Sequence, residues 1–219
     1  MWLFDIIFGT NKGKCGRNLT WTLDDDGILI INGTGSMHSP ATDLGIPWRN
    51  KLRLITKVMI DDDVTSIGIF AFKGCTSLSE IKFPSGLTKI DGMAFCYCSS
   101  LLEIEIPDSV TRIGEFSFCW CTSLSEIKIP SGVEEIGDGA FQHCKNLQDI
   151  EISFGVKEIG NLVFLGCDSL KEITIPESVE EIGTAIFKKC DSLETIYYPA
   201  GANFVDKLRE GNDAELIPY

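Results

Sequence analysis

The chain has 219 residues, of which 44% are hydrophobic and 23% are charged, a balance typical of one folded domain rather than of a disordered chain. The formal net charge of −13 argues against a nucleic-acid surface and against a face for anionic membranes, because both need a basic patch. No run of about 18 apolar residues occurs, so we expect no insertion into a membrane.

Residues 1–60 are expected to form an N-terminal cap that hides the open end of the core. Two strand-like runs, Leu19–Leu23 and Ile28–Ile31, flank an Asp/Gly tetrad and predict a β-hairpin. The Asn32–Gly35 segment is expected to end the second of these strands. A short helix is expected in Pro47–Arg53, and the apolar residues that follow it resemble the end of a degenerate first repeat.

A 23-residue repeat begins at Val64 with the line VTSIGIFAFKGCTSLSEIKFP and returns five more times. Five apolar columns recur at fixed spacing, so each unit, or rung, buries its face against its neighbours, which is the signature of a solenoid. The columns start at Val64, Ile67, Phe72, Leu78 and Ile81 and end at Val179, Ile182, Phe187, Leu193 and Ile196.

Within a rung, we expect a short strand at Val64–Ile67, a helical turn at Phe70–Cys75 and a second strand at Leu78–Phe83. The second strands should stack into a parallel sheet. A column of small residues is expected at a corner that needs positive φ. It consists of Gly68, Asp91, Gly114, Gly137, Gly160 and Gly183.

Six full repeats are therefore expected over residues 61–199. Beyond Pro199 the pattern stops, and Asn203–Arg209 is expected to form a short helix with Phe204 and Leu208 on one face. Residues 200–219 would then be a C-terminal cap that covers an edge open to pairing with another chain.

The unit Ile-Gly-x-x-Ala-Phe-x-x-Cys-x-Ser-Leu-x-x-Ile-x-Ile-Pro resembles the BspA-like class of leucine-rich repeats, and the resemblance covers about residues 15–205. The preceding Leu19–Leu23, Gly33–Met37 and Pro47-Trp48 are similar to a segment that often precedes such repeats in bacterial surface proteins. The implied fold class is α/β and β-rich, a right-handed, curved leucine-rich-repeat solenoid with a parallel sheet, short helical turns and terminal caps. The resemblance also implies adhesion to proteins or host surfaces, at the cell surface or after secretion.

Nine cysteines occur, and six of them form one column: Cys75, Cys98, Cys121, Cys144, Cys167 and Cys190. Neighbouring thiols would lie about 5 Å apart, a separation that permits disulfides. All thiols of a column point the same way, however, so we expect each buried S–H to cap a backbone carbonyl rather than to join a disulfide framework. The pairs Cys96-x-Cys98 and Cys119-x-Cys121 leave zinc as an alternative, although alternate residues point apart.

Acidic side chains form an exposed column on the second strands, between the buried Leu and Ile positions. The column is Glu80, Glu103, Glu126, Asp149 and Glu172. Beside it run Lys82, Glu105, Lys128 and Glu151, whose alternating sign offsets repulsion along the stack. This face is either a solvated surface or a docking face for a basic partner, and residues 133–219, with 17 acidic against 7 basic residues, would steer such a partner.

Three rings, Tyr97, Trp120 and His143, occupy one variable column in consecutive rungs. They are either a local stack on a half-exposed edge or a contact spot for a partner, since Tyr and Trp are enriched at binding hot spots.

Catalytic patterns are poor in this sequence. It contains only two histidines and no phosphate-binding loop, H-E-x-x-H or G-x-S-x-G motif, so we expect no enzyme and no cofactor or metal. The exposed carboxylates lie in no water-excluding cleft that acid–base chemistry would need.

The function expected is non-catalytic binding of a protein, such as a host matrix or surface protein with a basic patch. The alternative is an intracellular interaction scaffold or an inhibitor domain. Met1–Phe8 favours this alternative, because the segment is short, is interrupted by Asp5 and lacks the basic lead of a complete signal peptide.

Overall fold

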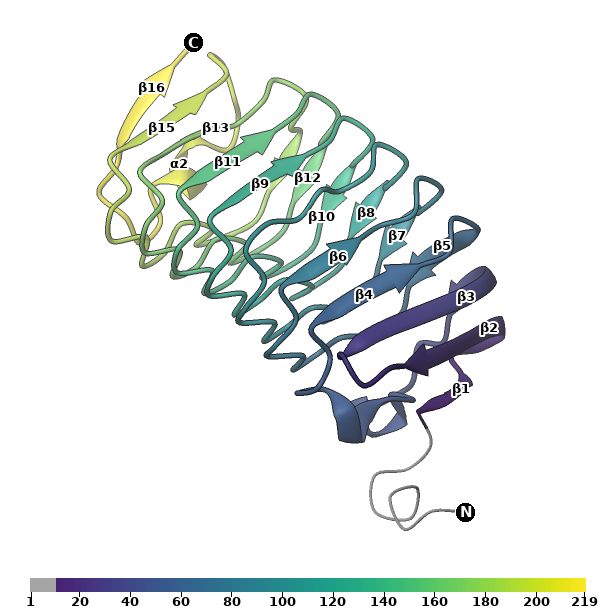
Figure 1. Ribbon diagram of the computed structural model, residues 1–219. Helices are drawn as coiled ribbons and strands as arrows, with labels where there is room; N and C mark the ends of the chain where they lie inside the picture. The colour runs from purple at the N-terminus through teal and green to yellow at the C-terminus, as the bar shows by residue number, and fades with distance from the viewer. Residues whose placement is uncertain (1–10) are drawn as a thin grey trace.

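The computed structural model describes residues 11–219, so the expectation about Met1–Phe8 lies outside the described residues. The chain winds into a solenoid of stacked turns, with β1 (Lys12–Lys14) at one end and β16 (Glu215–Pro218) at the other (Figure 1). Among the described residues, helix is limited to two short 3₁₀ turns and one α-helix of four residues. The β-rich leucine-rich-repeat solenoid expected from the sequence is confirmed.

The N-terminal hairpin is present and extends further than expected. β2 (Gly16–Leu23) pairs antiparallel with β3 (Ile28–Met37), and β1 pairs with β2. The expectation that Asn32–Gly35 ends the second strand is wrong. Gly33 and Gly35 take φ angles of 115° and 92°, which only glycine adopts freely, so the strand bends and continues.

The bent strand β3 is the first strand of both rows of strands in the solenoid. Its first half pairs in parallel with β4 (Lys57–Ile60) and its second half with β5 (Val64–Ile67). The 3₁₀ turns η1 (Asp43–Gly45) and η2 (Arg49–Lys51) lie between β3 and β4, and η2 falls where the short helix was expected.

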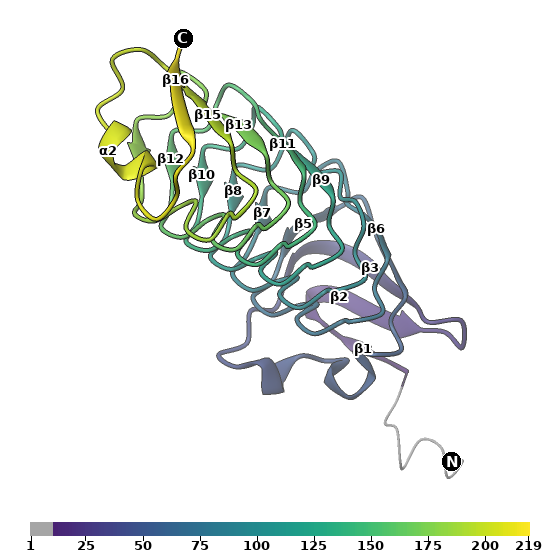
Figure 2. The ribbon, with the colours of Figure 1, turned by 90° about the vertical axis from the view of Figure 1, so that its left-hand side faces the viewer.

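The first strands of successive rungs make an unbroken parallel ladder, in which each residue pairs with the residue 23 positions later. Figure 2 shows this row and the row of second strands on different sides of the solenoid. After β5, the ladder contains β7 (Lys89–Ile90), β8 (Arg112–Ile113), β10 (Glu135–Ile136), β12 (Glu158–Ile159) and β14 (Glu181–Ile182).

The second strands form a parallel sheet that is interrupted rather than continuous. Its ladders are β3–β4–β6, β9–β11 and β13–β15–β16, and the rung between β6 and β9 contributes only an isolated bridge from Glu105 to Lys128. The bounds are β6 (Glu80–Lys82), β9 (Glu126–Ile129), β11 (Asp149–Ile152), β13 (Glu172–Thr174) and β15 (Thr195–Tyr198).

The segment expected as a helical turn is instead a run of hydrogen-bonded turns. Phe70 and Gly74 take φ angles of 62° and 78°, which a right-handed helix does not contain. The N–H of Phe72 donates to the carbonyl of Ala94 in the next rung at 2.7 Å, whereas the N–H of Cys75 donates within its own rung to Phe72 at 3.0 Å. Later rungs repeat this alternation, so the turns also tie the rungs together.

The glycine column is needed for space, and the expectation that it needs positive φ is wrong. Gly114, Gly137 and Gly160 are not among the residues with positive φ. A Cβ added to Gly137 would lie 2.7 Å from the backbone nitrogen of Glu115 in the preceding rung. At Gly137 the backbones of neighbouring rungs therefore approach too closely to admit a side chain, whereas the equivalent corner two rungs earlier in the chain accommodates Asp91.

The core is a row of stacked rings along the solenoid axis. Consecutive phenylalanines lie 5.1–5.8 Å apart between ring centroids. The row comprises Phe72, Phe95, Phe118, Phe141, Phe164 and Phe187, all fully buried. Trp48 extends it at the N-terminal end, stacking on Phe72 at 5.7 Å and donating its Nε1–H to the Ala71 carbonyl at 2.8 Å. The apolar columns predicted from the repeat thus form one continuous core.

The C-terminal end contains the expected short helix, α2 (Val205–Leu208), with Phe204 and Leu208 buried. Lys207 Nζ donates to the Ile182 carbonyl at 2.6 Å, and Glu210 Oε2 accepts the N–H of Ala185 at 2.8 Å. These side chains take the place of a further rung as partners of the last backbone groups. The limits of the two caps, residues 1–60 and 200–219, stay a prediction.

One polar side chain interrupts the buried Ala positions next to the phenylalanine row. Ser117 is fully buried, and its Oγ has no hydrogen-bond partner among the described residues. The equivalent positions in the neighbouring rungs are Ala94 and Ala140.

Replacing Ser117 by Ala should therefore raise the free energy of unfolding by about 1 kcal/mol, because it removes an unpaired buried hydroxyl. Urea denaturation monitored by circular dichroism measures the change. The matched reverse variant, Ala140→Ser, should lower stability by a similar amount. A destabilised Ser117→Ala protein would show that the hydroxyl is paired and the interpretation wrong.

Candidate functional site

The row of second strands is hollowed into a groove of about 1090 Å³. Strands β6, β9, β11 and β13 line it, together with residues 103–108 of the interrupted rung. Their side chains alternate, so the Ile side chains point toward the core while the intervening side chains point into the groove. The groove therefore lies on the face that the sequence left open as either a solvated surface or a docking face.

All five carboxylates of the predicted column line this groove and are exposed. They are Glu80, Glu103, Glu126, Asp149 and Glu172. Altogether eight carboxylates and only two ammonium groups, those of Lys82 and Lys128, line the groove. Neighbouring rungs lie about 5 Å apart, so the carboxylates add up to a strong negative potential.

Two ion pairs between neighbouring rungs partly neutralise this negative potential. Lys57 Nζ lies 2.5 Å from Glu80 Oε1, and Lys128 Nζ lies 2.8 Å from Glu151 Oε1, each across one step of a parallel ladder. The second pair confirms part of the alternation in sign expected for the column beside the carboxylates. Both pairs are largely exposed, so each contributes only about 0–1 kcal/mol to stability.

The three predicted rings form a stack, which we call the aromatic ridge (Tyr97, Trp120 and His143). The ring centroids of Tyr97 and Trp120 lie 5.8 Å apart at an interplanar angle of 13°, and those of Trp120 and His143 lie 4.2 Å apart at 39°. Tyr97 is 48% exposed, and the other two rings are half-buried. The ridge lies on the turn that precedes the second strands, so the structure does not place it among the groove residues.

The ridge residues adopt a left-handed backbone conformation that the two flanking rungs assign to glycine and the last rung to Lys189. Tyr97, Trp120 and His143 have φ angles of 65°, 60° and 61°, and the flanking equivalent positions are Gly74 and Gly166. The left-handed conformation costs an L-residue about 1–2 kcal/mol, whereas each ring contact returns about 0.5–1.5 kcal/mol. Fold stability alone therefore gives little reason to retain three rings here.

The surroundings of the His143 imidazole disfavour its protonated form. Burial lowers the pKa of His143 below its ordinary value, Lys145 and Lys189 lower it further, and Asp168 opposes them. A neutral ring stacks on Trp120 as an aromatic group rather than as a cation.

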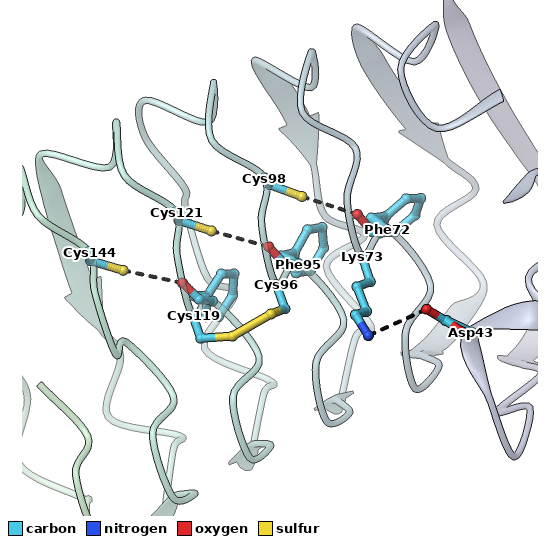
Figure 3. The surroundings of a disulfide bond; sticks show 10 residues. Asp43, Phe72, Lys73, Phe95, Cys96, Cys98, Cys119, Cys121 and Cys144 are labelled. Carbon is cyan, nitrogen blue, oxygen red and sulfur yellow. Dashed lines mark hydrogen bonds and ion pairs between the residues drawn. A yellow bond between two sulfur atoms is a disulfide. The ribbon is translucent and has the colours of Figure 1, made fainter. Parts of the chain in front are cut away.

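Five of the six cysteines in the predicted column cap a backbone carbonyl, as expected from the sequence. The S–H groups of Cys98, Cys121 and Cys144 donate to the carbonyls of Phe72, Phe95 and Phe118, each at 3.2 Å (Figure 3). Cys167 and Cys190 repeat the contact at 3.3 and 3.0 Å. Burial raises the pKa of Cys144 and of Cys190 to about 12, so these thiols are poor nucleophiles.

The expectation of no disulfide is wrong for one pair. Cys96 and Cys119 are bonded across neighbouring rungs, with Cα atoms 4.7 Å apart (Figure 3). They belong to a different column, two residues before the thiols that cap carbonyls, and there the two side chains turn toward each other. The sequence signal for this disulfide was that Cys96 and Cys119 themselves lie one repeat of 23 residues apart. The argument that all thiols of a column point the same way holds for the buried column and fails for this one.

The described residues show no arrangement of side chains that supports the alternative of a zinc site. Within residues 11–219, no group of three or more His, Cys, Asp or Glu side chains is placed to hold a metal ion. In the same range, no helix is long and apolar enough to cross a membrane.

Comparisons with known proteins agree with this fold. A family model described as the BspA type leucine-rich repeat region matches residues 50–101 and 88–208 in six copies. A solved leucine-rich-repeat protein from T. pallidum is 30% identical, covers 94% of this chain and 100% of its own, and has a TM-score of 0.66.

Two other solved structures are less similar. A leucine-rich-repeat protein from Eubacterium ventriosum is 22% identical, with 87% of this chain and 73% of that chain covered and a TM-score of 0.46. One from Bacteroides ovatus is 21% identical, with 84% and 70% covered and a TM-score of 0.42. No curated protein matches the sequence.

The thiol arrangement predicts how the protein reacts with Ellman's reagent. The native protein should not react at neutral pH, because all seven free cysteines are buried. The unfolded protein should release seven equivalents, and nine after reduction of the disulfide. A Ser131→Cys variant, with its new thiol at an exposed turn, is the positive control and should label once in the native state. Labelling of several native thiols would contradict the buried column.

Proposed function

The chain belongs to the BspA-type leucine-rich-repeat family, and we propose that it is a non-catalytic module that binds a basic protein in its acidic groove. Proteins built on this repeat generally act through interaction with other proteins. The observation that carries the proposal is the groove itself, with eight carboxylates, two ammonium groups and a volume of about 1090 Å³.

The arrangement of charge supports binding rather than catalysis. The carboxylates stand in a row on successive rungs and are exposed, whereas an acid–base pair needs a site that excludes water. Exposed charges of this kind accelerate association with a partner of opposite sign and select against acidic partners. They add modest affinity each, so the groove suits a partner that presents several basic side chains at once.

The aromatic ridge is proposed as a second contact for the same partner. Rings that are already stacked lose little conformational entropy on binding, and Tyr and Trp dominate many binding hot spots. The ridge and the groove share three rungs, because Tyr97, Trp120 and His143 each precede a groove carboxylate by six residues. Six residues span at most roughly 20 Å, so one partner can reach both.

We propose that the protein acts at the cell surface or after secretion, in adhesion to a host matrix or surface protein. The Cys96–Cys119 disulfide supports this localisation, because disulfides persist in oxidising compartments and are rare in a reducing cytoplasm. Burial of the seven remaining thiols suits the same setting, since it protects them from oxidation. The alternative of an intracellular scaffold or inhibitor domain is less well supported for the same reason.

The groove can be tested with a charge-neutralising triple variant, Glu103→Gln/Glu126→Gln/Asp149→Asn. Binding of a labelled oligolysine peptide, followed by fluorescence anisotropy, should weaken about tenfold at low salt, as expected for three exposed ion pairs. Binding to the unmodified protein should also fall steeply as salt is added.

The matched control for this experiment changes the same net charge on the other side of the solenoid. Glu158→Gln/Glu180→Gln/Glu181→Gln alters three exposed carboxylates of the first-strand side. An equal loss in this control would mean that only net charge matters, and absence of binding to the unmodified protein would refute the proposal. A pull-down from host matrix proteins at low and high salt then searches for the natural partner.

The proposed compartment can be tested through the disulfide. Cells that produce the protein naturally are quenched with acid, free thiols are alkylated, and the peptides that contain Cys96 and Cys119 are examined by mass spectrometry. The two cysteines should be recovered as a disulfide, whereas recovery of both as alkylated thiols would contradict a location outside the cytoplasm. The double variant Cys96→Ser/Cys119→Ser should lose about 3 kcal/mol of stability, because the bond closes a loop of 23 residues.

A further inference from the structure

The two ends of the aromatic ridge differ. At the end of His143, a Cβ added to Gly166 would run into the imidazole, so this ring lies directly over the glycine. At the end of Tyr97, a Cβ added to Gly74 would have only Leu52 Cδ1 nearby, at 3.8 Å. The row of rings therefore ends at Tyr97, which is 48% exposed, and no ring fills the space above Gly74 beside its free face.

The open face belongs to a rigid part of the molecule. The disulfide joins Cys96 to Cys119, the residues directly before Tyr97 and Trp120, and the N–H of Tyr97 donates to the Cys119 carbonyl at 2.8 Å. Trp120 covers the other face of the Tyr97 ring. Tyr97 is thus held in place for a ligand that stacks on its free face.

One basic group beside this space, that of Lys73, is already engaged in an ion pair. Lys73, the residue before Gly74, extends toward Asp43, and the two charged atoms lie 3.5 Å apart (Figure 3). Its Nζ also lies 5.1 Å from the centroid of the Phe70 ring. The formal net charge of the chain is −13, so the long-range field favours a cationic ligand.

We propose that the space above Gly74 binds an arginine side chain of the basic partner, stacked on the open face of Tyr97. A guanidinium group is planar, stacks on aromatic faces and holds its charge while losing part of its hydration. A lysine ammonium is compact and strongly hydrated, so it gains less from this site. The inference rests on the proposed function, because it assigns one side chain of the same basic partner.

Two labelled peptides of equal length and charge, hexa-arginine and hexa-lysine, test the site. The acidic groove attracts both, whereas the ridge should favour arginine, so hexa-arginine should bind about fivefold more tightly in fluorescence anisotropy. Equal affinity of the two peptides would overturn the arginine site and leave the proposed function standing. Absence of binding by either peptide would refute the proposed basic partner itself.

A Gly74→Tyr variant fills the site with a fourth ring. The fold should accept this residue, because the equivalent Tyr97 has a φ angle of 65° and Gly74 has one of 78°. The preference for arginine should disappear, while the affinity for hexa-lysine stays unchanged. Persistence of the preference in a variant with a native circular dichroism spectrum would overturn the proposal.

Two further variants guard against failure of this one to fold. Tyr97→Ala removes the stacking surface and should also abolish the preference for arginine. Lys189→Tyr places a ring in the same column but away from the site, and should change the affinities of both peptides equally. The groove triple variant should weaken both peptides and keep their ratio, and loss of the ratio there would place the arginine in the groove instead.

Discussion

The hydrogen bonds between rungs are the constraint on which the rest of the structure depends. They run in both directions, since the N–H of Phe72 reaches forward to Ala94 while the N–H of Thr88 reaches back to Thr65. These bonds set a common spacing of about 5 Å along the whole solenoid. Every column of side chains must then stack at that spacing, whether it contains phenylalanine, cysteine, glycine or carboxylate.

The same spacing also aligns the exposed side chains into continuous rows of charges and rings. Like charges such as Glu126 and Asp149 cannot move apart, so they make a groove of sustained negative potential instead of scattered surface charges. Rings at the same spacing stack, and the Cys96–Cys119 bond clamps two of the rungs that carry them. The fold therefore supplies rigid presentation, while the identity of the exposed residues supplies specificity.

Features that follow from the repeat period and from strand alternation could be read from the sequence. The buried phenylalanine row, the thiols that cap carbonyls and the exposed position of Glu80 and its equivalents all follow from a strict period and strand alternation. Features set by distances between rungs could not. The disulfide, the steric need for Gly137 and the interruption at residues 103–106 depend on how closely two backbones approach and on which way a turn directs its side chains.

The sequence by itself determined the solenoid, its register and the two candidate contact surfaces, because each rung repeats the same local chemistry and can bury its face only against its neighbours. Only the tertiary structure decided that Cys96 and Cys119 meet, that the rings stack in left-handed backbone positions, and that the stack ends with an open face above Gly74. The physical reason is that these properties arise from the backbone path through the turns, where alternating φ angles redirect successive side chains, and a repeat pattern does not encode that path explicitly.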